Sequence, residues 1–194
     1  EVASIIETEG IGVESKLVEA LSVEFYGIGG ALPGPVSTPN EYSEEQLQEK
    51  LSRVPGAGEK PGQAHGRSDM GKLVLICHQP PHKTAADKAM KLKHVGSRVL
   101  RQWMDAHQPL LVLTGHIHES AGWDCYGQTC ILNPGSFKEG KYAEAEIDFA
   151  AGSEPAGEQS GSGGDHGRSD EPDPVDRAGR ARGRAQVKAR LLSI

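Results

Sequence analysis

The stretch Leu110-Leu111-Val112-Leu113-Thr114-Gly115-His116-Ile117-His118 joins an apolar run directly to a pair of histidines. A short uncharged run of Leu and Val is typical of a buried strand, so we predict a strand over Leu110–Thr114. If the chain stays extended, His116 and His118 point to the same side, because side chains alternate across a strand. Gly115 allows the backbone to leave the strand tightly. Neutral imidazoles held at the end of a strand indicate metal binding.

A second apolar run of the same kind also ends in a histidine. Lys72–Cys77 is followed by His78 and then by Gln79-Pro80-Pro81-His82. The two prolines cannot donate to a sheet ladder, so the strand has to stop there and a rigid loop begins. A His-x-His pair alone is a weak signal and often lies on a protein surface by accident. Two neighbouring strands that both deliver histidines at their carboxyl ends instead predict one shared crevice.

The composition limits the class of protein. The chain has 194 residues, of which 36% are hydrophobic, and a formal net charge of −6. Its mean hydropathy of −0.49 is low and indicates one domain with unpacked appendages. The negative charge disfavours nucleic acid as a partner. The apolar runs are far shorter than the roughly 18 residues of a membrane-spanning helix, so we expect no membrane partner and a cytoplasmic location.

The three cysteines do not form an even disulfide framework. Cys125 and Cys130 flank Tyr126–Thr129 and could face each other across a hairpin. The preferred interpretation is that both are small buried residues, reduced in the cytosol. Cys77 lies inside an apolar strand and is predicted to belong to the core.

The amino-terminal half contains one strand and one helix with recognisable boundaries. Val23–Ile28 is predicted to be a strand. Ser43 is predicted to cap a helix, and Gln46 occupies the reciprocal capping-box position. Residues 55–71 are rich in Gly, Pro and charge and are predicted to form a solvated insertion loop.

The following segment is predicted to contain a helix, a hairpin and a strand. Ala85–His107 has helical spacing, although Gly96 interrupts it and allows two shorter helices. Gly122–Leu132 has the pattern of a hairpin. Tyr142–Phe149 alternates apolar and acidic residues, as a half-exposed strand does.

Residues 151–194 differ in composition from the rest of the chain. Gly, Ser, Pro, Asp and Arg dominate there, and aromatic residues are absent. Such a segment buries too little apolar surface to offset its chain entropy, so we predict a disordered tail. Its basic end, Arg177–Arg190, could bind nucleic acid, but a solvated tail is preferred.

Several motifs occur in an order that resembles a known family. In chain order they are Leu75–Pro81, Thr84, Asp87, His94–Ser97, Gly115–Glu119 and Asn133–Ser136. The combination resembles the calcineurin-like metallophosphoesterases and is most similar to a branch of small prokaryotic phosphoesterases. The resemblance covers roughly Gly10 to Phe149.

The resemblance implies an α/β (α+β) fold over residues 1–150, in which two sheets form a sandwich flanked by helices (αββα). It also implies two divalent metal ions, manganese or alternatively iron, zinc or magnesium. The implied activity is hydrolysis of a phosphate mono- or diester by a metal-bound hydroxide. By the resemblance, His78 and His116 bind one metal and His118 binds the other.

The sequence departs from the family in its carboxylate ligands. Family members also use Asp-x-His, Gly-Asp and Gly-Asn motifs, and none of these precedes His78 here. Three imidazoles without a bridging carboxylate leave two dications facing each other at a Coulomb cost, without the hard ligands that Mn or Mg prefers. The chain also begins with Glu1 rather than Met. We therefore expect a carboxyl-terminal portion of the domain, inactive alone, whose residues Glu1–Glu9 end a helix.

Other residues of these motifs are candidates for the substrate side of the site. His82, His94 and Asn133 are candidate substrate-binding residues, and Glu119 is a candidate partner that orients a ligand histidine. The structural alternatives are a tight turn at Asn133, a helix cap at Asp87 and a surface position for His94.

Two functions follow from these observations. The preferred one is a metal-dependent phosphoesterase whose amino-terminal ligand motifs are missing from this chain. The alternative is a non-catalytic remnant or scaffold of the same fold. The identity of the substrate is not encoded in the motifs.

Overall fold

The structure is a computed structural model that describes residues 12–34, 39–57, 69–90, 93–149 and 185–193. The helix end expected at Glu1–Glu9 lies outside these residues. So do most of the insertion loop predicted at 55–71 and most of the tail predicted at 151–194.

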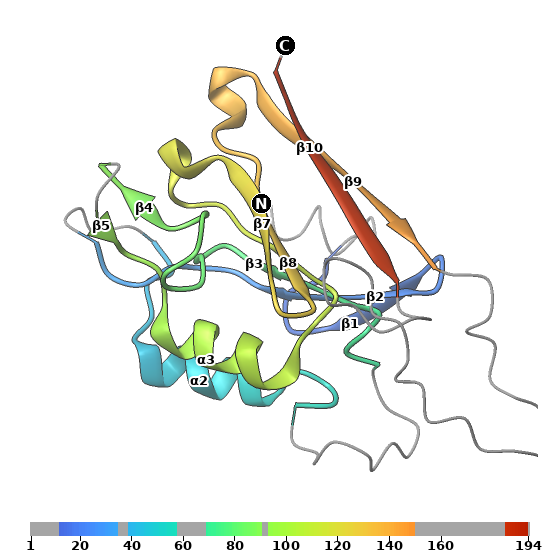
Figure 1. Cartoon of the computed structure of the whole chain (residues 1–194). Helices are drawn as coiled ribbons and strands as arrows, with labels where there is room; N and C mark the ends of the chain where they lie inside the picture. Colours follow the sequence, from blue (N-terminus) through green and yellow to red (C-terminus); the bar gives the residue numbers. More distant parts are fainter. Residues whose placement is uncertain (1–11, 35–38, 58–68, 91–92, 150–184, 194) are drawn as a thin grey trace, which may run out of the picture.

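A six-stranded sheet forms the centre of the described structure, in the order β1-β2-β3-β6-β8-β7 (Figure 1). Its strands are β1 (Leu17–Ala20), β2 (Val23–Ile28), β3 (Leu73–Cys77), β6 (Leu111–Leu113), β7 (Gly122–Tyr126) and β8 (Thr129–Asn133). β2, β3, β6 and β8 run parallel, while β1 and β7 are antiparallel to their neighbours at the two edges. The predicted strands and the predicted hairpin are therefore confirmed, with small differences at their ends.

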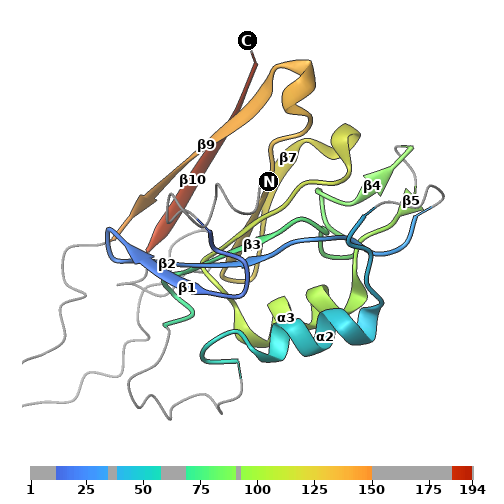
Figure 2. The ribbon, with the colours of Figure 1, turned by 180° about the vertical axis from the view of Figure 1, so that it is seen from behind.

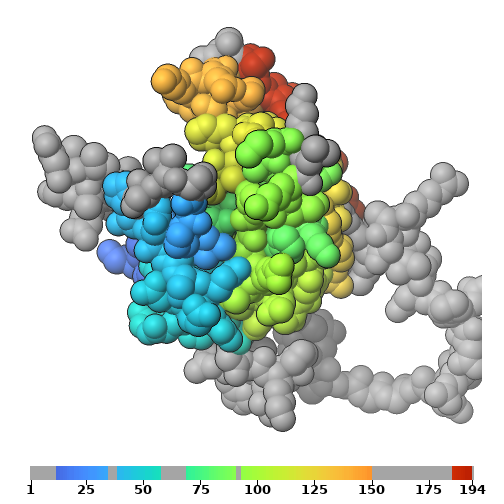
Figure 3. Space-filling view, turned by 90° about the vertical axis from the view of Figure 1, so that its left-hand side faces the viewer, coloured from blue at the N-terminus to red at the C-terminus, as the bar shows by residue number. Residues whose placement is uncertain are grey.

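The helices α2 (Glu44–Ser52) and α3 (Arg98–His107) cover one face of this sheet (Figures 1 and 2). They pack side by side at the surface of the molecule (Figure 3). Their apolar side chains and those of the sheet make a buried core, which includes Tyr26, Ile28, Leu47, Leu51, Leu73, Leu75, Leu100, Trp103, Met104, Val112 and Ile131. This layer fixes the positions of the strand ends that carry the histidines.

Both helices have defined amino-terminal caps. The Ser43 hydroxyl accepts a hydrogen bond from the Gln46 amide at 3.3 Å, and the Gln46 side chain accepts one from the Ser43 amide at 2.8 Å. This confirms the predicted capping box. At α3, the Ser97 hydroxyl accepts a bond from the Leu100 amide at 3.0 Å, and Glu44 accepts one from the Arg98 amide at 2.8 Å. The Glu44 carboxylate also complements the positive end of the α3 dipole.

The other face of the sheet is partly covered by a two-stranded ribbon. β9 (Lys141–Asp148) pairs antiparallel with β10 (Gln186–Ser193), and the ribbon crosses over the sheet (Figures 1 and 2). A second apolar cluster lies between them, with Val23, Val74, Leu110, Leu111, Cys130, Leu132 and Val187 as its buried members. The predicted fold class, mixed α/β with a calcineurin-like arrangement of sheet and helices, is confirmed.

The strand β10 corrects the prediction that the chain from 151 to its end is a disordered tail. Gln186–Ser193 alternates small or apolar residues with basic ones, which suits pairing with the acidic strand β9. Lys188 contacts Asp148 at 3.2 Å, and Arg190 forms an ion pair with Glu144. Val187 is buried against the sheet.

The prediction of helix over Ala85–His107 is wrong for its first half. Among the described residues of this stretch only Arg98–His107 is helical, and those before it form a loop with the short strands β4 (Lys88–Ala89) and β5 (Lys93–His94). The cause is the buried Asp87 side chain, which accepts hydrogen bonds from three backbone amides of this loop. These bonds replace helical ones, and Asp87 caps no helix.

Among the helices of the described residues, none is long and apolar enough to cross a bilayer.

Candidate metal and substrate site

The parallel pairing of β3 and β6 brings two histidine-bearing loops to the same edge of the sheet. Leu75 lies opposite Val112, so both strands end at the same level. His78 directly follows β3, and its carbonyl accepts hydrogen bonds from the Gly115 amide at 3.2 Å and from the Thr114 hydroxyl at 3.3 Å. The loop after β6 is therefore anchored to the loop after β3.

His78 and His116 lie next to each other at this edge. Their ring centroids are 5.2 Å apart and the planes are inclined by 72°. His116 has a left-handed backbone conformation, with φ of 65°, and the Ile117 amide donates to the Gly115 carbonyl at 2.7 Å. His118 then begins the short 3-10 helix η1 (His118–Ser120). The expectation that the chain stays extended over His116–His118 is therefore wrong, because the backbone turns directly after β6.

The electrostatics favour the neutral imidazole at His78 and at His116. Burial lowers the pKa of His78, and the nearby His116 and His118 rings lower it further. The pKa of His116 is also lowered, first by burial and then by His118. A neutral imidazole carries the lone pair that a metal ion binds. The structure thus gathers three imidazoles within electrostatic reach of one another.

The donor set is incomplete for a dinuclear metal centre. Among the described residues, no group of three or more His, Cys, Asp and Glu side chains has the arrangement needed to hold a metal ion. Glu119, the nearest carboxylate in sequence, accepts a hydrogen bond from the Met90 amide at 2.6 Å. The residues that the structure describes therefore do not by themselves fit the two metals that the resemblance implies.

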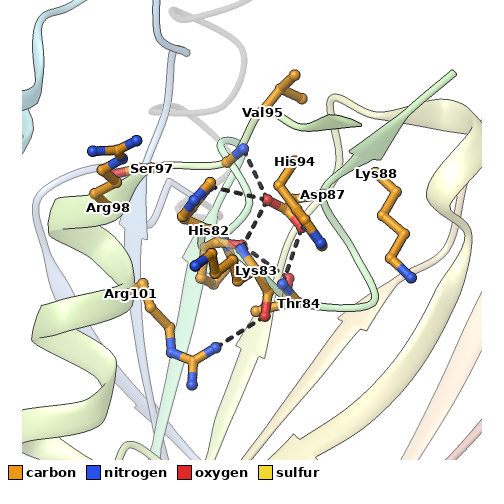
Figure 4. A network of polar contacts seen from close by, with 12 residues as sticks. His82, Lys83, Thr84, Asp87, Lys88, His94, Val95, Ser97, Arg98 and Arg101 are labelled. Atoms are coloured by element: carbon orange, nitrogen blue, oxygen red, sulfur yellow. Dashed lines mark hydrogen bonds and ion pairs between the residues drawn. The ribbon is translucent and has the colours of Figure 1, made fainter. Parts of the chain in front are cut away.

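The loop between β3 and α3 is organised around Asp87 (Figure 4). This carboxylate is fully buried and accepts bonds from the amides of Lys83, Thr84 and Gly96, each at 3.0 Å. His94 approaches it through Nδ1 at 2.6 Å, and Nδ1 of His82 lies 3.6 Å away. The predicted substrate-side residues His82 and His94 are thus brought together, with ring centroids 5.8 Å apart.

Asn133 connects this loop to the histidine loop. Its buried amide nitrogen donates to the carbonyls of Ala86 at 3.3 Å and Ile117 at 2.9 Å, and its oxygen accepts from the Gly135 amide at 3.0 Å. The Asn133 side chain is therefore fully used in holding three segments together. Within these contacts it acts as a positioning residue for the site.

Two further contacts join β4 to η1. The Ser120 hydroxyl donates to the Lys88 carbonyl at 2.6 Å, and Glu119 binds the Met90 amide as described above. The segments that carry His82, His94, His116 and His118 thus form one connected edge of the molecule.

A hollow of about 680 Å³ opens beside His78 on the sheet face opposite the helices. Its wall is mainly apolar, and its lining includes Ile28, Cys77, Leu113, Phe137, Lys141 and Tyr142. Phe137 and Lys141 did not emerge from the sequence, because they belong to no motif; Lys141 begins β9, and Phe137 lies in the 3-10 helix Phe137–Glu139 just before it.

The cysteines also differ from expectation. Cys125 and Cys130 face each other across the β7–β8 hairpin, as predicted, but they form a disulfide rather than two reduced residues. Directly opposite positions in an antiparallel pair bring the two sulfur atoms within bonding reach. Cys77 is a free and buried thiol in the core, as predicted.

Comparisons with known proteins agree with this architecture. Residues 67–151 match the model of a family described as metallophosphoesterase, calcineurin superfamily. The chain is 31% identical over 138 residues to an uncharacterized protein of Methanocaldococcus jannaschii. That alignment covers 69% of this chain and 58% of the relative, so the chain spans little more than half of the relative's length.

Two solved structures are similar at lower sequence identity, and the first of them shares the fold. One crystal structure superposes with a TM-score of 0.51 at 23% identity, over 73% of this chain and 54% of the other. A second, the protein TT1561 of Thermus thermophilus, gives a TM-score of 0.47 at 17% identity, over 73% of this chain and 57% of its own. Over residues 67–151, the chain is therefore similar to the calcineurin superfamily of metallophosphoesterases.

Proposed function

We propose that the chain is part of a phosphoesterase that hydrolyses a phosphate mono- or diester at a dinuclear metal centre. His78, His116 and His118 supply imidazole ligands, with His78 and His116 on one metal and His118 on the other. The observation that carries this proposal is the adjacent pair His78 and His116, whose ring centroids lie 5.2 Å apart at the end of two parallel strands, in a region similar to this superfamily.

The carboxylate ligands of this centre come, in our proposal, from a segment that precedes the sequence. The donor set supports this, because among the described residues no group of three or more His, Cys, Asp and Glu side chains could hold a metal ion. The relative from Methanocaldococcus jannaschii is longer than the aligned region, which covers 58% of it. Manganese is the first choice of metal, because a mixed set of imidazoles and carboxylates suits it, whereas imidazoles alone favour zinc.

The remaining residues act on the substrate side. His82 and His94 contact the phosphate ester, Asn133 holds their loop against the histidine loop, and Glu119 orients a neighbouring segment. We also propose a cytoplasmic location, which the redox state of Cys125 and Cys130 in the cell tests.

The experiment is hydrolysis of p-nitrophenyl phosphate and bis(p-nitrophenyl) phosphate with added Mn²⁺, by the longest protein that the coding region provides. Loss of a metal ligand removes the centre, so we expect His116→Ala and His118→Ala each to lower kcat/KM by at least about 100-fold. Lys188→Gln, on the exposed strand β10, is the control and is expected to keep full activity. Unchanged hydrolysis in both histidine variants would show that the metal assignment is wrong.

A scaffold without catalytic activity is the second candidate, favoured by the incomplete donor set of the described residues. It predicts that the longer protein also binds no metal and hydrolyses neither ester. Metal analysis of that protein after dialysis separates the two functions.

A further inference from the structure

The disulfide between Cys125 and Cys130 joins two strands that are already neighbours in one hairpin. The two cysteines lie directly opposite each other in β7 and β8 and are five positions apart in the sequence. A crosslink stabilises a fold most when it closes a long loop, and this one closes a short loop that the hairpin turn has already closed. The effect of the bond is therefore concentrated on the hairpin.

Strand β7 is held weakly by its other contacts. It is an edge strand of the described sheet, and within that sheet it pairs on one side only, with β8. None of its five residues is buried, and Trp123 is 44% exposed, whereas all five residues of β8 are buried. Strands with few buried contacts open locally more easily than the core of a protein. The bond at Cys125 thus fastens β7 to a strand that belongs to the core.

The carboxyl end of β7 holds the loop that contains Asp87. The Tyr126 hydroxyl accepts a hydrogen bond from the Ala85 amide at 2.9 Å. Arg101 lies over the Tyr126 ring, with 4.8 Å between the guanidinium carbon and the ring centroid. The same guanidinium donates to the Lys83 carbonyl at 3.1 Å (Figure 4). Tyr126 and its neighbour Arg101 therefore support the backbone directly before Asp87.

The amino end of β7 leads to the histidine loop. The strand begins at Gly122, just after η1, whose first residue is His118. The hydrogen bonds of Glu119 and Ser120 described above attach η1 to the backbone around β4, which belongs to the same loop as Asp87. β7 thus carries, at its two ends, contacts that keep the histidine loop and the Asp87 loop together.

We propose that the bond between Cys125 and Cys130 is a redox switch that controls how firmly β7 holds these two loops together. In the oxidised chain the bond keeps β7 on β8, and both loops are ordered. In the reduced chain β7 opens more often, and its contacts with the Asp87 loop loosen.

The reductant in this switch is a dithiol, and the reaction is thiol–disulfide exchange. One thiolate of the dithiol attacks Sγ of Cys125, which is the more exposed of the two cysteines, and the thiolate of Cys130 leaves. The second thiolate of the reductant then attacks its own sulfur in the mixed disulfide and releases Cys125. The chain gains two electrons and two protons as two thiols, while the dithiol becomes a disulfide. Exchange with a small disulfide reverses the reaction.

The switch regulates the site of the proposed function, so its effect on catalysis rests on that function. A dinuclear site needs its histidine loop and substrate side in a fixed geometry, and small displacements of positioned groups lower the rate strongly. We therefore expect the oxidised state to be the more active one. In the longer protein, reduction is expected to lower kcat/KM for p-nitrophenyl phosphate by about tenfold or more.

The test is amide hydrogen exchange of the 194-residue chain before and after treatment with dithiothreitol. Intact mass is expected to show that the folded chain gains two hydrogen atoms, since Cys77 is already a free thiol. We expect the amides of Ala85 and Met90, which bond Tyr126 and Glu119, to exchange at least about tenfold faster after reduction. The Gln46 amide, which bonds a side-chain oxygen on α2, is the control and should keep its rate.

Two variants separate the switch from other effects of the reductant. The double change Cys125→Ser and Cys130→Ser is expected to give fast exchange at Ala85 and Met90 with and without dithiothreitol. Tyr126→Phe keeps the disulfide and removes the acceptor of the Ala85 amide. Ala85 should then exchange fast in both redox states, while Met90 still responds to reduction.

The switch is refuted if dithiothreitol leaves the bond intact in the folded chain. It is also refuted if exchange at Ala85 and Met90 accelerates no more than at Gln46, because the bond then only adds general stability. Redox-dependent exchange in a longer protein that hydrolyses neither ester would refute the proposed function and leave the switch. Equal hydrolysis in both redox states, together with unchanged exchange, would refute the switch and leave the function.

Discussion

At His78 and His116 two effects act on the imidazole pKa in the same direction. Burial is the larger effect. The second is electrostatic repulsion from the positive charge of a neighbouring protonated ring, which lowers the pKa further. Both rings therefore resist protonation in the folded chain, whereas in the unfolded chain they take up protons near the ordinary pKa of 6.5. The lowered pKa values keep both imidazoles neutral and able to bind a cation, and they also lower the stability of the fold at acidic pH.

These lowered pKa values determine how the free energy of unfolding of the metal-free chain depends on pH. Because the unfolded state binds more protons below about pH 6.5, we expect the free energy of unfolding to fall as the pH drops through that value and to level off only below the lowered pKa values. His116→Ala removes one repulsive neighbour, so the pKa of His78 is expected to rise towards 6.5. An NMR titration of the His78 ring in the presence of a chelator measures this shift. A pKa for His78 that falls or stays constant in His116→Ala would contradict the assignment.

Asn133 allows a second prediction for a single residue. Its buried amide makes three hydrogen bonds, and replacing it leaves the carbonyls of Ala86 and Ile117 without their donor. We expect Asn133→Ala to lower the free energy of unfolding by about 2–3 kcal/mol, the usual cost of buried groups that lose their partners. Asn133→Asp, which puts a carboxylate against two carbonyls, is expected to cost more. Urea denaturation measures both, with Ser52→Ala on the exposed end of α2 as a control that stays within about 0.5 kcal/mol.

Among the secondary-structure elements, those with a local cause could be predicted from the sequence. The strands β2, β3 and β6 are apolar runs with clear stops, and α2 begins with a capping box written into neighbouring residues. The loop before α3 could not be predicted in the same way. Its apolar residues do have helical spacing. The hydrogen bonds that favour the loop over a helix, however, run to Asp87 from backbone amides that lie before it and after it in the sequence.

The candidate site also has some features that could be predicted from the sequence and others that could not. The histidines His78 and His116 could be placed at one sheet edge, because parallel strands end together. Three other features depend on contacts between segments distant in the sequence. They are the backbone turn at His116, the hydrogen bonds that Asp87 accepts and the hydrogen bonds of the Asn133 side chain. The strand β10 was missed because it follows a long stretch of low-complexity sequence, and its partner β9 lies about 40 residues earlier, as the ion pair of Lys188 with Asp148 shows.

The packing of β10 on the sheet gives a prediction for an element. Val187 is 5% exposed in the second apolar cluster, whereas Leu191 on the same strand is 40% exposed. Val187→Ala removes about two methylene equivalents from this cluster, so we expect a loss of about 1.5–2 kcal/mol in the free energy of unfolding. Leu191→Ala is the matched control and is expected to cost less than about 0.5 kcal/mol. Equal losses in the two variants would mean that β10 does not pack as described.

The β7–β8 hairpin gives a prediction about redox state. The bond between Cys125 and Cys130 closes a short loop, and loops of this size contribute about 2 kcal/mol of stability in the chain-entropy account. Reduction, or the double change Cys125→Ser and Cys130→Ser, is therefore expected to lower the free energy of unfolding by about that amount. Alkylation of the unfolded, unreduced protein should label only Cys77, as mass spectrometry would show. Labelling of all cysteines in protein trapped rapidly from cells would support the proposed cytoplasmic location and show that the bond forms later.

For the molecule as a whole, the two faces of the sheet are covered to different extents. The helices cover one face with a continuous core, while the β9–β10 ribbon covers the other only in part (Figures 1 and 2). The hollow of about 680 Å³ beside His78 lies on this second face. Among the described residues, the incompletely covered face thus adjoins the candidate site at His78.

This coincidence yields a prediction for the whole molecule. Because the described residues contain no group of three or more His, Cys, Asp and Glu side chains that could hold a metal ion, we expect the 194-residue chain alone to retain manganese in less than stoichiometric amounts after dialysis. We also expect it to hydrolyse p-nitrophenyl phosphate no faster than its own His116→Ala variant. In a longer protein that supplies the carboxylates, the same segment should pack against the apolar hollow, so binding of a hydrophobic dye should fall as metal content and hydrolysis rise. Full activity of the 194-residue chain, abolished by His116→Ala, would show instead that its own residues complete the centre.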